Sequence, residues 1–356
     1  MAKIRVLVVD DSITVRRYLV NALASDPLIE VVGEAEDGKR AIELCEQLHP
    51  DVLTLDMMLP ILDGLAATEH IMAYCPTPIL IVSSSMNRGE VFKTYDALAA
   101  GALDVLDKSP ASGTNGSWEK ELIAKVKTAS HIRVIMHPRA RLAARRGMPA
   151  NASASNLTST PTYNCVVIGA STGGPGAVHD LLAGLPADFP LPMLLVIHIG
   201  APFGVALCDW LNGLSPIRVV VAQDGQMLPK VGEVGMIMAP HHRHLVVRGG
   251  RLWFSDEPER HSCRPAVDVL FESVAREMGK STIACLLTGM GGDGAAGMLA
   301  IRQAGGMTLA QDEQTSVVFG MPKVAIDMGA ARRVLPLQDF APTLIRLASG
   351  KDTSER

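Results

Sequence analysis

The sequence has few aromatic residues, no long apolar run and no pairs of closely spaced cysteines. Aromatic residues make up only 4% of its 356 residues, but apolar residues reach 48% and charged residues 20%, a balance that excludes a chain disordered throughout. No stretch approaches the roughly 20 apolar residues of a membrane-spanning helix, and the apolar run at residues 4–10 is too short for a signal peptide. We therefore expect a globular protein that is not inserted in a membrane.

The cysteines lie too far apart for the spacing of a zinc site or of a disulfide framework. We therefore expect a reducing, cytoplasmic location. The six cysteines are Cys45, Cys75, Cys165, Cys208, Cys263 and Cys285.

Charge is distributed unevenly along the chain, whose net charge is −4. Residues 1–129 carry 12 Lys and Arg against 19 Asp and Glu, a net −7; residues 130–162 carry five Arg and no acid; the remainder carries 16 against 18, a net −2. Neither acidic part has the basic surface of a nucleic-acid-binding domain. We expect no nucleic-acid partner.

Length and composition indicate two domains joined by a linker. A chain of 356 residues exceeds one ordinary core. Between residues 131 and 164, Arg, Ala, Ser, Thr, Asn and Pro predominate, and such a segment buries little apolar surface. We predict a first domain at residues 1–129, a flexible basic linker at residues 130–162 and a second domain at residues 163–356.

Short β-branched runs alternate with helical stretches in both predicted domains. Because parallel strands need crossover connections and covered faces, each domain is predicted to be a doubly wound α/β sheet. The first has five predicted parallel strands, at residues 4–10, 31–35, 51–56, 78–83 and 104–108. The second is larger and mainly parallel, with predicted strands at residues 165–169, 192–199, 217–222, 235–239, 281–288 and 307–311 and an antiparallel hairpin at residues 244–255.

Polar side chains stand at the strand ends of the first domain, the edge at which such sheets bind ligands. They are Asp10 and Asp11 after the first strand, Asp56 after the third, Ser83 after the fourth and Lys108 after the fifth. The three carboxylates repel one another unless a cation such as Mg²⁺ is bound, and the serine and lysine would bind phosphoryl oxygens. Taken singly, an acid here could instead cap the following helix, as Asp11 or Ser12 would do.

Together these residues resemble a response-regulator receiver domain over nearly the whole first segment. The resemblance implies a flavodoxin-like sheet, phosphorylation of Asp56 by a partner histidine kinase, and Mg²⁺ bound at Asp10, Asp11 and Asp56. It also implies that Lys108 contacts the phosphate. Two positions depart from the family pattern: Leu59 precedes Pro60 where methionine is usual, and Ser109 separates the lysine from Pro110, which leaves the usual cis peptide bond open.

Ser171 lies where a buried apolar run ends in a glycine-rich turn and a helix begins. A serine at such a turn is exposed near backbone N–H groups that can stabilise an oxyanion. Residues 169–173, GASTG, also fit the Gly-x-Ser-x-Gly pattern, which often occurs by chance. Two other interpretations stay open on this motif alone: Ser171 as the helix cap, and the glycines as a loop that binds a nucleotide phosphate.

His198 and Asp293 are the predicted partners of Ser171. Each follows a strand, so parallel pairing would bring both to the edge that carries the serine. A serine nucleophile needs a base, and the base needs an orienting carboxylate. The order serine, histidine, acid along the chain differs from that of the α/β hydrolases and indicates another fold.

Three further histidines, His241, His242 and His244, cluster in the sequence. No other ligands at metal spacing accompany them, so we expect no zinc site there. We interpret all three as exposed loop residues, with contact between one of them and substrate as the alternative.

These segments together resemble the catalytic domain of the chemotaxis protein-glutamate methylesterases, the CheB-type family, over nearly all of residues 163–340. The resemblance rests on ASTGGP at residues 170–175, RPAVDVLF at 264–271, TGMGGDG at 288–294, QDE at 311–313 and GMP at 320–322. It implies Ser171 as nucleophile, His198 as general base and Asp293 as its orienting acid. It further implies oxyanion donors at Thr172 and at the backbone N–H of Met290.

One departure from this family follows His198, where Gly204 stands at the usual place of a threonine. We expect it to alter either the substrate groove or the cap of the next helix.

The resemblance implies hydrolysis of glutamyl methyl esters on the cytoplasmic domains of chemoreceptors, through an acyl-enzyme, with release of methanol. Glutamine deamidation would be a second activity, and no cofactor is expected for the esterase. The unphosphorylated receiver would cover the esterase site until phosphorylation releases it. Two rivals stay open: a response regulator with a non-catalytic interaction or nucleic-acid output domain, and an unrelated esterase with a regulatory domain.

Overall fold

The computed structural model describes residues 3–84, 88–108, 117–132, 134 and 163–350. Its contacts divide the chain into two compact units, Met1–Pro149 and Ala150–Arg356, which we describe separately. Most of the predicted linker, and the Ser109-Pro110 bond, lie outside the described residues.

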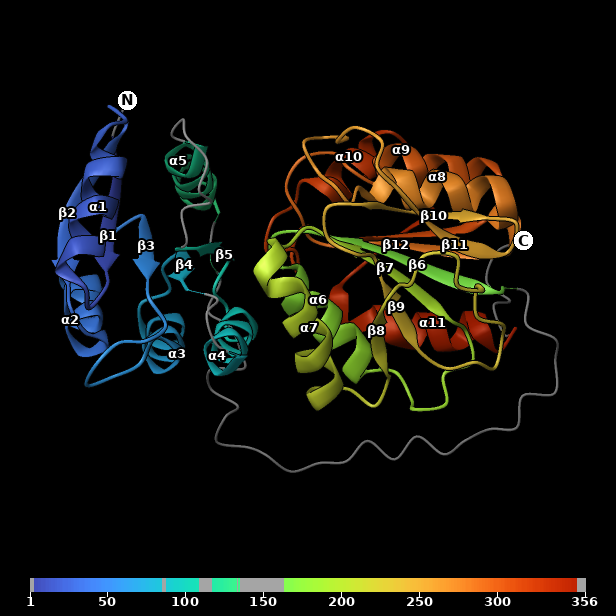
Figure 1. The fold of residues 1–356 in the computed structure, drawn as a ribbon, viewed down its shortest axis with the longest axis horizontal. Coiled ribbons are helices and arrows are strands. Elements are labelled where there is room, and N and C mark those ends of the chain that lie inside the picture. Colours follow the sequence, from blue (N-terminus) through green and yellow to red (C-terminus); the bar gives the residue numbers. More distant parts are fainter. Residues whose placement is uncertain (1–2, 85–87, 109–116, 133, 135–162, 351–356) are drawn as a thin grey trace. The chain divides into compact units, whose positions relative to one another are not determined.

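The first unit is a five-stranded sheet in the order β2-β1-β3-β4-β5, with every neighbouring pair parallel (Figure 1). Its elements are β1 Ile4–Val9, α1 Ile13–Ala24, β2 Ile29–Ala35, α2 Gly38–Leu48, β3 Val52–Leu55, α3 Gly64–Tyr74, β4 Ile79–Ser83, α4 Arg88–Ala99, β5 Asp104–Asp107 and α5 Ser117–Ala129. Helices α1 and α5 contact each other, and α2, α3 and α4 contact one another in series, so helices cover both faces. The predicted doubly wound parallel sheet is confirmed.

The second unit contains a seven-stranded sheet in the order β14-β13-β12-β6-β7-β9-β8, again with all pairs parallel. Its strands are β6 Cys165–Ala170, β7 Met193–Ile197, β8 Val219–Val221, β9 Met236–Met238, β12 Thr282–Leu286, β13 Met307–Gln311 and β14 Arg333–Leu335. Its helices are α6 Gly174–Ala183, α7 Ala201–Leu214, α8 Val267–Met278, α9 Ala295–Gln303, α10 Met321–Asp327 and α11 Phe340–Ala348, with short 3₁₀ turns at Gly279–Ser281 and Leu337–Asp339. Helices α8, α9 and α10 lie on one face and α6, α7 and α11 on the other (Figure 1).

The predicted hairpin is present as β10, His244–Arg248, and β11, Arg251–Ser255. It forms a separate two-stranded antiparallel sheet that contacts α8 and does not join the parallel sheet. Gly249 and Gly250 form its two-residue turn with φ of 58° and 69°, a left-handed conformation that glycine adopts without strain.

One hydrophobic core of the second unit lies between the central strands, the helices α8, α9 and α10 and the hairpin. Val167, Leu194, Phe271 and Met298 are fully buried members of it. Because interiors pack as densely as crystals, this core holds the ends of β6, β7 and β12 in fixed positions. No helix in the described part of the chain has the length and apolar character needed to cross a membrane.

Candidate functional sites

The candidate esterase residues lie at the carboxyl ends of three adjacent strands. Ala170 of β6 pairs with Ile197 of β7, so Ser171 and His198 are the next residues on neighbouring strands. The His198 N–H donates to the Ala170 carbonyl at 3.1 Å, and the Ser171 N–H donates to the carbonyl of Thr288, beyond β12, at 3.0 Å. Strand pairing thus brings the serine and the histidine to one edge.

Gly173, and not Ser171, is the N-cap residue of α6. Its φ is 76°, and a Cβ there would lie 2.5 Å from the Cβ of Val317. The glycine is therefore required both by the backbone conformation and by the close approach of Val317. The interpretation of Ser171 as a helix cap is wrong, and its side chain is left for another role.

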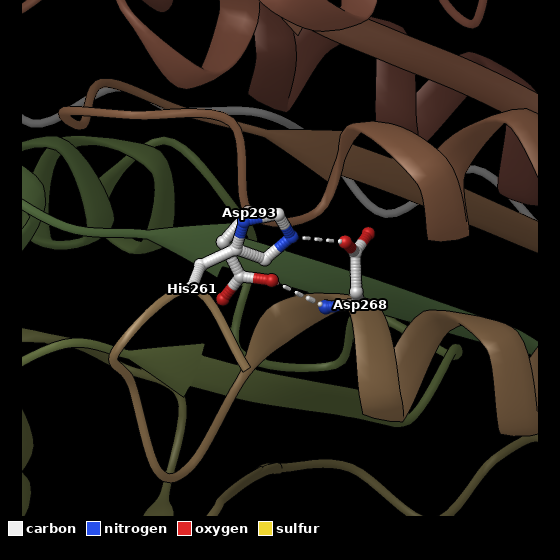
Figure 2. A group of neighbouring side chains, drawn as sticks. All are labelled: His261, Asp268 and Asp293. Atoms are coloured by element: carbon white, nitrogen blue, oxygen red, sulfur yellow. Dashed lines mark hydrogen bonds and ion pairs between the residues drawn. The ribbon is translucent and has the colours of Figure 1, made fainter. Parts of the chain in front are cut away.

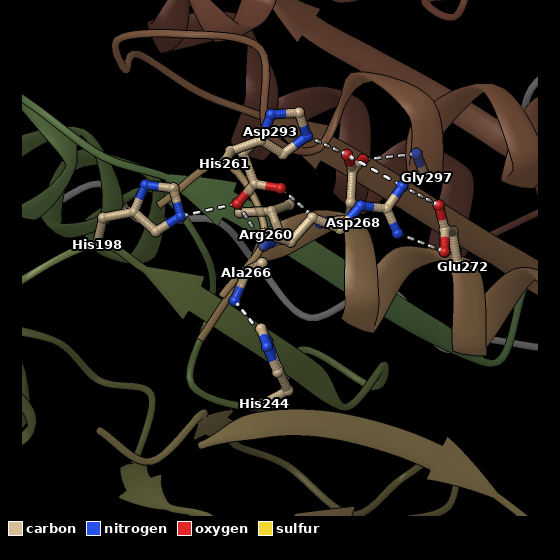
Figure 3. A network of polar contacts seen from close by, with 10 residues as sticks. His198, His244, Arg260, His261, Ala266, Asp268, Glu272, Asp293 and Gly297 are labelled. Carbon is tan, nitrogen blue, oxygen red and sulfur yellow. Dashed lines mark hydrogen bonds and ion pairs between the residues drawn. The ribbon is translucent and has the colours of Figure 1, made fainter. Parts of the chain in front are cut away.

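Asp293 and His198 form a hydrogen bond of 2.8 Å between Oδ2 and Nε2 (Figure 3). Asp293 is only 1% exposed. Its carboxylate also accepts the backbone N–H groups of Val267 at 2.7 Å and Asp268 at 2.9 Å, in the first turn of α8. The helix N-terminus and the histidine together stabilise the ionised acid.

The pKa of Asp293 is lowered and the pKa of His198 is raised, in both cases against the effect of burial. Burial alone would raise the pKa of Asp293, but the bond to His198 and the two backbone N–H groups hold it below its ordinary value. Burial alone would lower the pKa of His198, but hydrogen bonding and charge interaction with Asp293 and Cys263 raise it to about 9. The imidazole therefore holds a proton tightly, and the neutral form that can accept a proton from serine becomes the main form only above about pH 9.

The predicted oxyanion residues border Ser171. A Cβ at Gly289 would lie 2.7 Å from the Ser171 Cβ and 3.2 Å from its backbone nitrogen, so the chain leading to Met290 passes directly against the serine. The carbonyl of Thr172 accepts the hydroxyl of Thr288 at 2.9 Å, which ties the serine turn to the same segment. Two glycine-dependent backbone segments thus meet at Ser171.

A second buried carboxylate, Asp268, lies behind Asp293 and was missed by the sequence analysis (Figure 2). It accepts the Gly297 N–H at 2.7 Å and lies 2.9 Å from the Nε2 of His261. The guanidinium of Arg260 lies 3.7 Å from Asp268. It also forms a bidentate ion pair with the carboxylate of Glu272, with N–O distances of 2.7 and 2.8 Å. The stretch at residues 264–271 was the one signal in the sequence, but nothing there identified the partners.

Burial raises the pKa of Asp268, and the nearby charge of Asp293 raises it further, whereas the Gly297 N–H, His261 and Arg260 act in the opposite direction. Ligand atoms of His261, Asp268 and Asp293 lie within 4.8 Å of one another. Each already has a hydrogen-bond partner within the protein, so we assign no ion to this cluster.

The prediction of three exposed loop histidines holds for His242 only; it is wrong for His244 and, as regards exposure, for His241. His242 is exposed and His241 is half-buried, but His244 is fully buried at the start of β10. Its Nδ1 accepts the Ala266 N–H at 3.1 Å, and its Nε2 lies 3.2 Å from the carbonyl of Pro258 (Figure 3). His244 therefore joins the hairpin to the residue that precedes α8.

In the first unit, the five predicted residues meet at the carboxyl edge of the sheet. The Nζ of Lys108 lies 2.6 Å from Asp10 Oδ2 and 2.7 Å from Asp56 Oδ2. The carboxylates of Asp10, Asp11 and Asp56 lie within 4.8 Å of one another. Ser83 pairs with Asp107 on the neighbouring strand, and its buried hydroxyl has no hydrogen-bond partner among the described residues.

The charges of this cluster fit a hard cation. Burial raises the pKa of Asp10, and the nearby charge of Asp56 raises it further. The hydrogen bond and charge of Lys108 act to lower it. Burial alone would lower the pKa of Lys108, but Asp56 and Asp10 raise it above its ordinary value. The cluster contains three carboxylates and only one ammonium. Carboxylate oxygens are the ligands that Mg²⁺ prefers. The helix-cap alternative applies to Ser12, which accepts the Val15 N–H at 3.4 Å as the N-cap of α1.

The two sites define the class of protein. One unit has an acidic cluster at its strand ends, and the other has a serine, a histidine and an aspartate at its sheet edge. The protein combines a receiver domain with a carboxylic ester hydrolase. Family models agree: residues 6–114 match the response regulator receiver domain and residues 166–344 match the CheB methylesterase. The chain belongs to the CheB methylesterase family, which confirms the resemblance seen in the motifs.

Relatives match over almost the whole chain. The protein is 41% identical over 345 residues to protein-glutamate methylesterase/protein-glutamine glutaminase 4 of Myxococcus xanthus, with 96% of each chain covered. It is 42% identical over 353 residues to the protein-glutamate methylesterase/protein-glutamine glutaminase of Symbiobacterium thermophilum, again with 96% of each covered. The crystal structure of the Thermotoga maritima CheB methylesterase catalytic domain is 37% identical, with a TM-score of 0.48, and covers 52% of this chain and 98% of that one.

Proposed function

We propose that this protein hydrolyses methyl esters of glutamate residues on the cytoplasmic domains of chemoreceptors, and deamidates specific glutamines there. The names of its relatives, protein-glutamate methylesterase/protein-glutamine glutaminase, support this substrate class. The observation that carries the proposal is the buried Asp293–His198 hydrogen bond at the strand edge that bears Ser171.

In the proposed mechanism, the Ser171 Oγ attacks the carbonyl carbon of the ester while His198 takes the hydroxyl proton. Because Nε2 is bonded to Asp293, Nδ1 is the nitrogen that transfers this proton. Backbone N–H groups near Thr172 and Met290 stabilise the oxyanion. The tetrahedral intermediate expels methanol, which receives the proton from His198, and water then hydrolyses the acyl-enzyme with the same base. A glutamine substrate would release ammonia at the same step.

The proposal assigns regulation to the first unit. Asp56 accepts a phosphoryl group from a partner histidine kinase, and Ser83 and Lys108 contact it. Asp10, Asp11 and Asp56 would hold Mg²⁺, which neutralises charge during the transfer. We assign the receiver to residues 1–129, the linker to 130–162 and the esterase to 163–356, in a cytoplasmic protein whose receiver releases the esterase site on phosphorylation.

Methanol release from methylated receptor cytoplasmic domains tests the catalytic proposal. The full-length protein should release methanol, and Ser171→Ala should lower the rate about 10⁶-fold, to background. Ser349→Ala, at the C-cap of α11, is the matched control and should retain the wild-type rate. A Ser171→Ala protein with full activity would refute the nucleophile, and a wild-type protein that releases no methanol would favour the non-catalytic output domain.

Acetyl phosphate with Mg²⁺ tests the regulatory proposal. It should label the wild-type protein and raise the rate of methanol release, whereas Asp56→Asn should show basal release, no label and no stimulation. Equal labelling of the two proteins would refute Asp56 as the acceptor.

A further inference from the structure

Gly204 and His241 compete for the same space. A Cβ built on Gly204, in the first turns of α7, would lie 1.3 Å from the Nε2 of His241 and 2.3 and 2.4 Å from two carbons of its ring. Contacts below 3.0 Å essentially never occur for a real Cβ. Any other residue at position 204 therefore requires the imidazole to move.

His241 follows β9, which is the neighbour of β7 in the sheet. The Ala239 N–H donates to the carbonyl of Leu195 at 2.8 Å, so β9 stays paired with β7 up to its own end. Along the carboxyl edge, the segment that carries His241 thus comes directly after the one that carries His198. Helix α7 begins three residues beyond that histidine, at Ala201.

The imidazole of His241 acts here through its volume. Its Nε2 is buried and has no hydrogen-bond partner among the residues that the structure describes. Burial lowers the pKa of His241, and the neighbouring His242 adds to this, so the ring stays neutral and carries no buried charge. It fills the place that a side chain at position 204 would take.

Gly204 is the residue at which the chain departs from the usual threonine of its family. The helix cap is Gly200, so position 204 is not the cap, and the expected effect on the cap is wrong. The close approach of His241 gives a local reason for glycine.

We propose that Gly204 and His241 are a matched pair of positioning residues that hold the start of α7 against the end of β9. The pair sets the conformation of residues 198–200, which join the general base to this helix. The proposal rests on the esterase function proposed above. Neither residue is assigned contact with the reacting atoms.

A pairwise substitution experiment on the activated full-length protein tests this. Gly204→Thr, the residue usual in the family, should displace the ring and lower kcat about tenfold or more, because small displacements of a catalytic group have effects of that order. Gly213→Thr is the matched control on the same helix, since nothing lies within 4 Å of a Cβ there, and it should retain the wild-type rate. The double variant Gly204→Thr/His241→Ser should regain most of the lost activity, as expected for residues in contact.

Two further readouts separate a positioning role from a general loss of stability. If the pair positions His198, Gly204→Thr should shift the pH midpoint of kcat/KM and slow the reaction of Ser171 with a fluorophosphonate. An unchanged midpoint, with a loss explained by thermal unfolding alone, would overturn the proposal. His241→Ser by itself should also slow the fluorophosphonate reaction, so the test holds even where Gly204→Thr does not fold.

The fluorophosphonate reaction needs no receptor and distinguishes failure of this inference from failure of the proposed function. A wild-type protein that reacts with the probe but releases no methanol would contradict the substrate assignment only. Equal probe and methanol rates for the wild type, Gly204→Thr and the double variant would contradict the matched pair only.

Discussion

The two candidate sites occupy the same place in their sheets but balance charge differently. In the receiver, three carboxylates lie close together, and the one ammonium, that of Lys108, pairs with two of them, Asp10 and Asp56. In the esterase, Asp293 has His198 and two backbone N–H groups, and the carboxylate behind it has an N–H, a histidine and an arginine. An incompletely balanced cluster is suited to accept a cation and a phosphoryl group, whereas a balanced one is suited to keep a single proton in place.

After the loss of the nucleophile itself, the largest expected effect comes from removing the charge of Asp293. Asp293→Asn should lower kcat for methanol release about 10⁴-fold, because an amide does not stabilise the protonated imidazole or fix its tautomer. Labelling of Asp56 by acetyl phosphate should be unchanged and serves as the control. A loss smaller than about tenfold would show that the acid does not orient the base.

The pH dependence of the esterase should expose the raised pKa of His198. With a pKa of about 9, the base form increases as the pH rises, so kcat/KM should grow roughly 50-fold between pH 7 and 9 and then level off. If kcat/KM instead rose with a midpoint near pH 6.5, the ordinary pKa of histidine being about 6.5, the raised pKa of His198 would be contradicted. Cys263→Ser should lower the midpoint, because Cys263 contributes to the shift.

The raised pKa of His198 also makes the stability of the folded protein depend on pH. A histidine whose folded pKa lies above its unfolded value binds the proton more tightly in the folded state. The contribution of His198 is therefore fully present below about pH 6.5 and is lost as the pH rises through about 9. Thermal unfolding followed across this range should show the loss in the wild type and less of it in His198→Gln.

In the receiver, removing one carboxylate should weaken cation binding. Asp10→Asn should lower the affinity for Mg²⁺ at least about tenfold, measured by calorimetry, because the cluster loses a ligand charge. Asp104→Asn is the control, since Asp104 lies at the opposite end of its strand and pairs with Lys125 at 2.6 Å. Unchanged affinity in Asp10→Asn would remove the case for a metal site there.

The smallest effects are expected from substitutions at Asp268, the carboxylate next to Asp293, and at its neighbour Glu272. Asp268→Asn keeps an oxygen for the Gly297 N–H but turns an amide toward His261, so Asp293 should be held less firmly and kcat should fall about fivefold to tenfold. Glu272→Gln, which alters only the partly exposed end of this network, should have almost no effect. Equal losses in the two variants would argue against a specific role for Asp268.

The strand ends were predictable because apolar runs and the acids, serines and glycines that follow them are close in sequence. Every predicted strand of both parallel sheets is found near its expected position, and the hairpin was signalled by its two glycines. The short edge strand β14, Arg333–Leu335, was missed because three residues with a charged end carry no recognisable period.

The network around Asp268 could not be predicted because its partners are contributed by separate turns and helices. His244 was misjudged for the same reason: its hydrogen-bond partners are Ala266 and Pro258, which the local sequence does not reveal. All three histidines were interpreted as loop residues because they follow Ala239 and Pro240 at the entry of the predicted hairpin. The space shared by Gly204 and His241 was likewise visible only after folding.

Asp293 also holds the first turn of α8, by accepting the N–H groups of Val267 and Asp268. An asparagine there offers one acceptor oxygen in place of two, so an inactive protein made at this position would also have a looser helix. A bait intended to capture a receptor without releasing its methyl group is therefore better made at Ser171, whose side chain takes no part in holding that helix. The choice of substitution decides whether such a bait still presents the native binding surface.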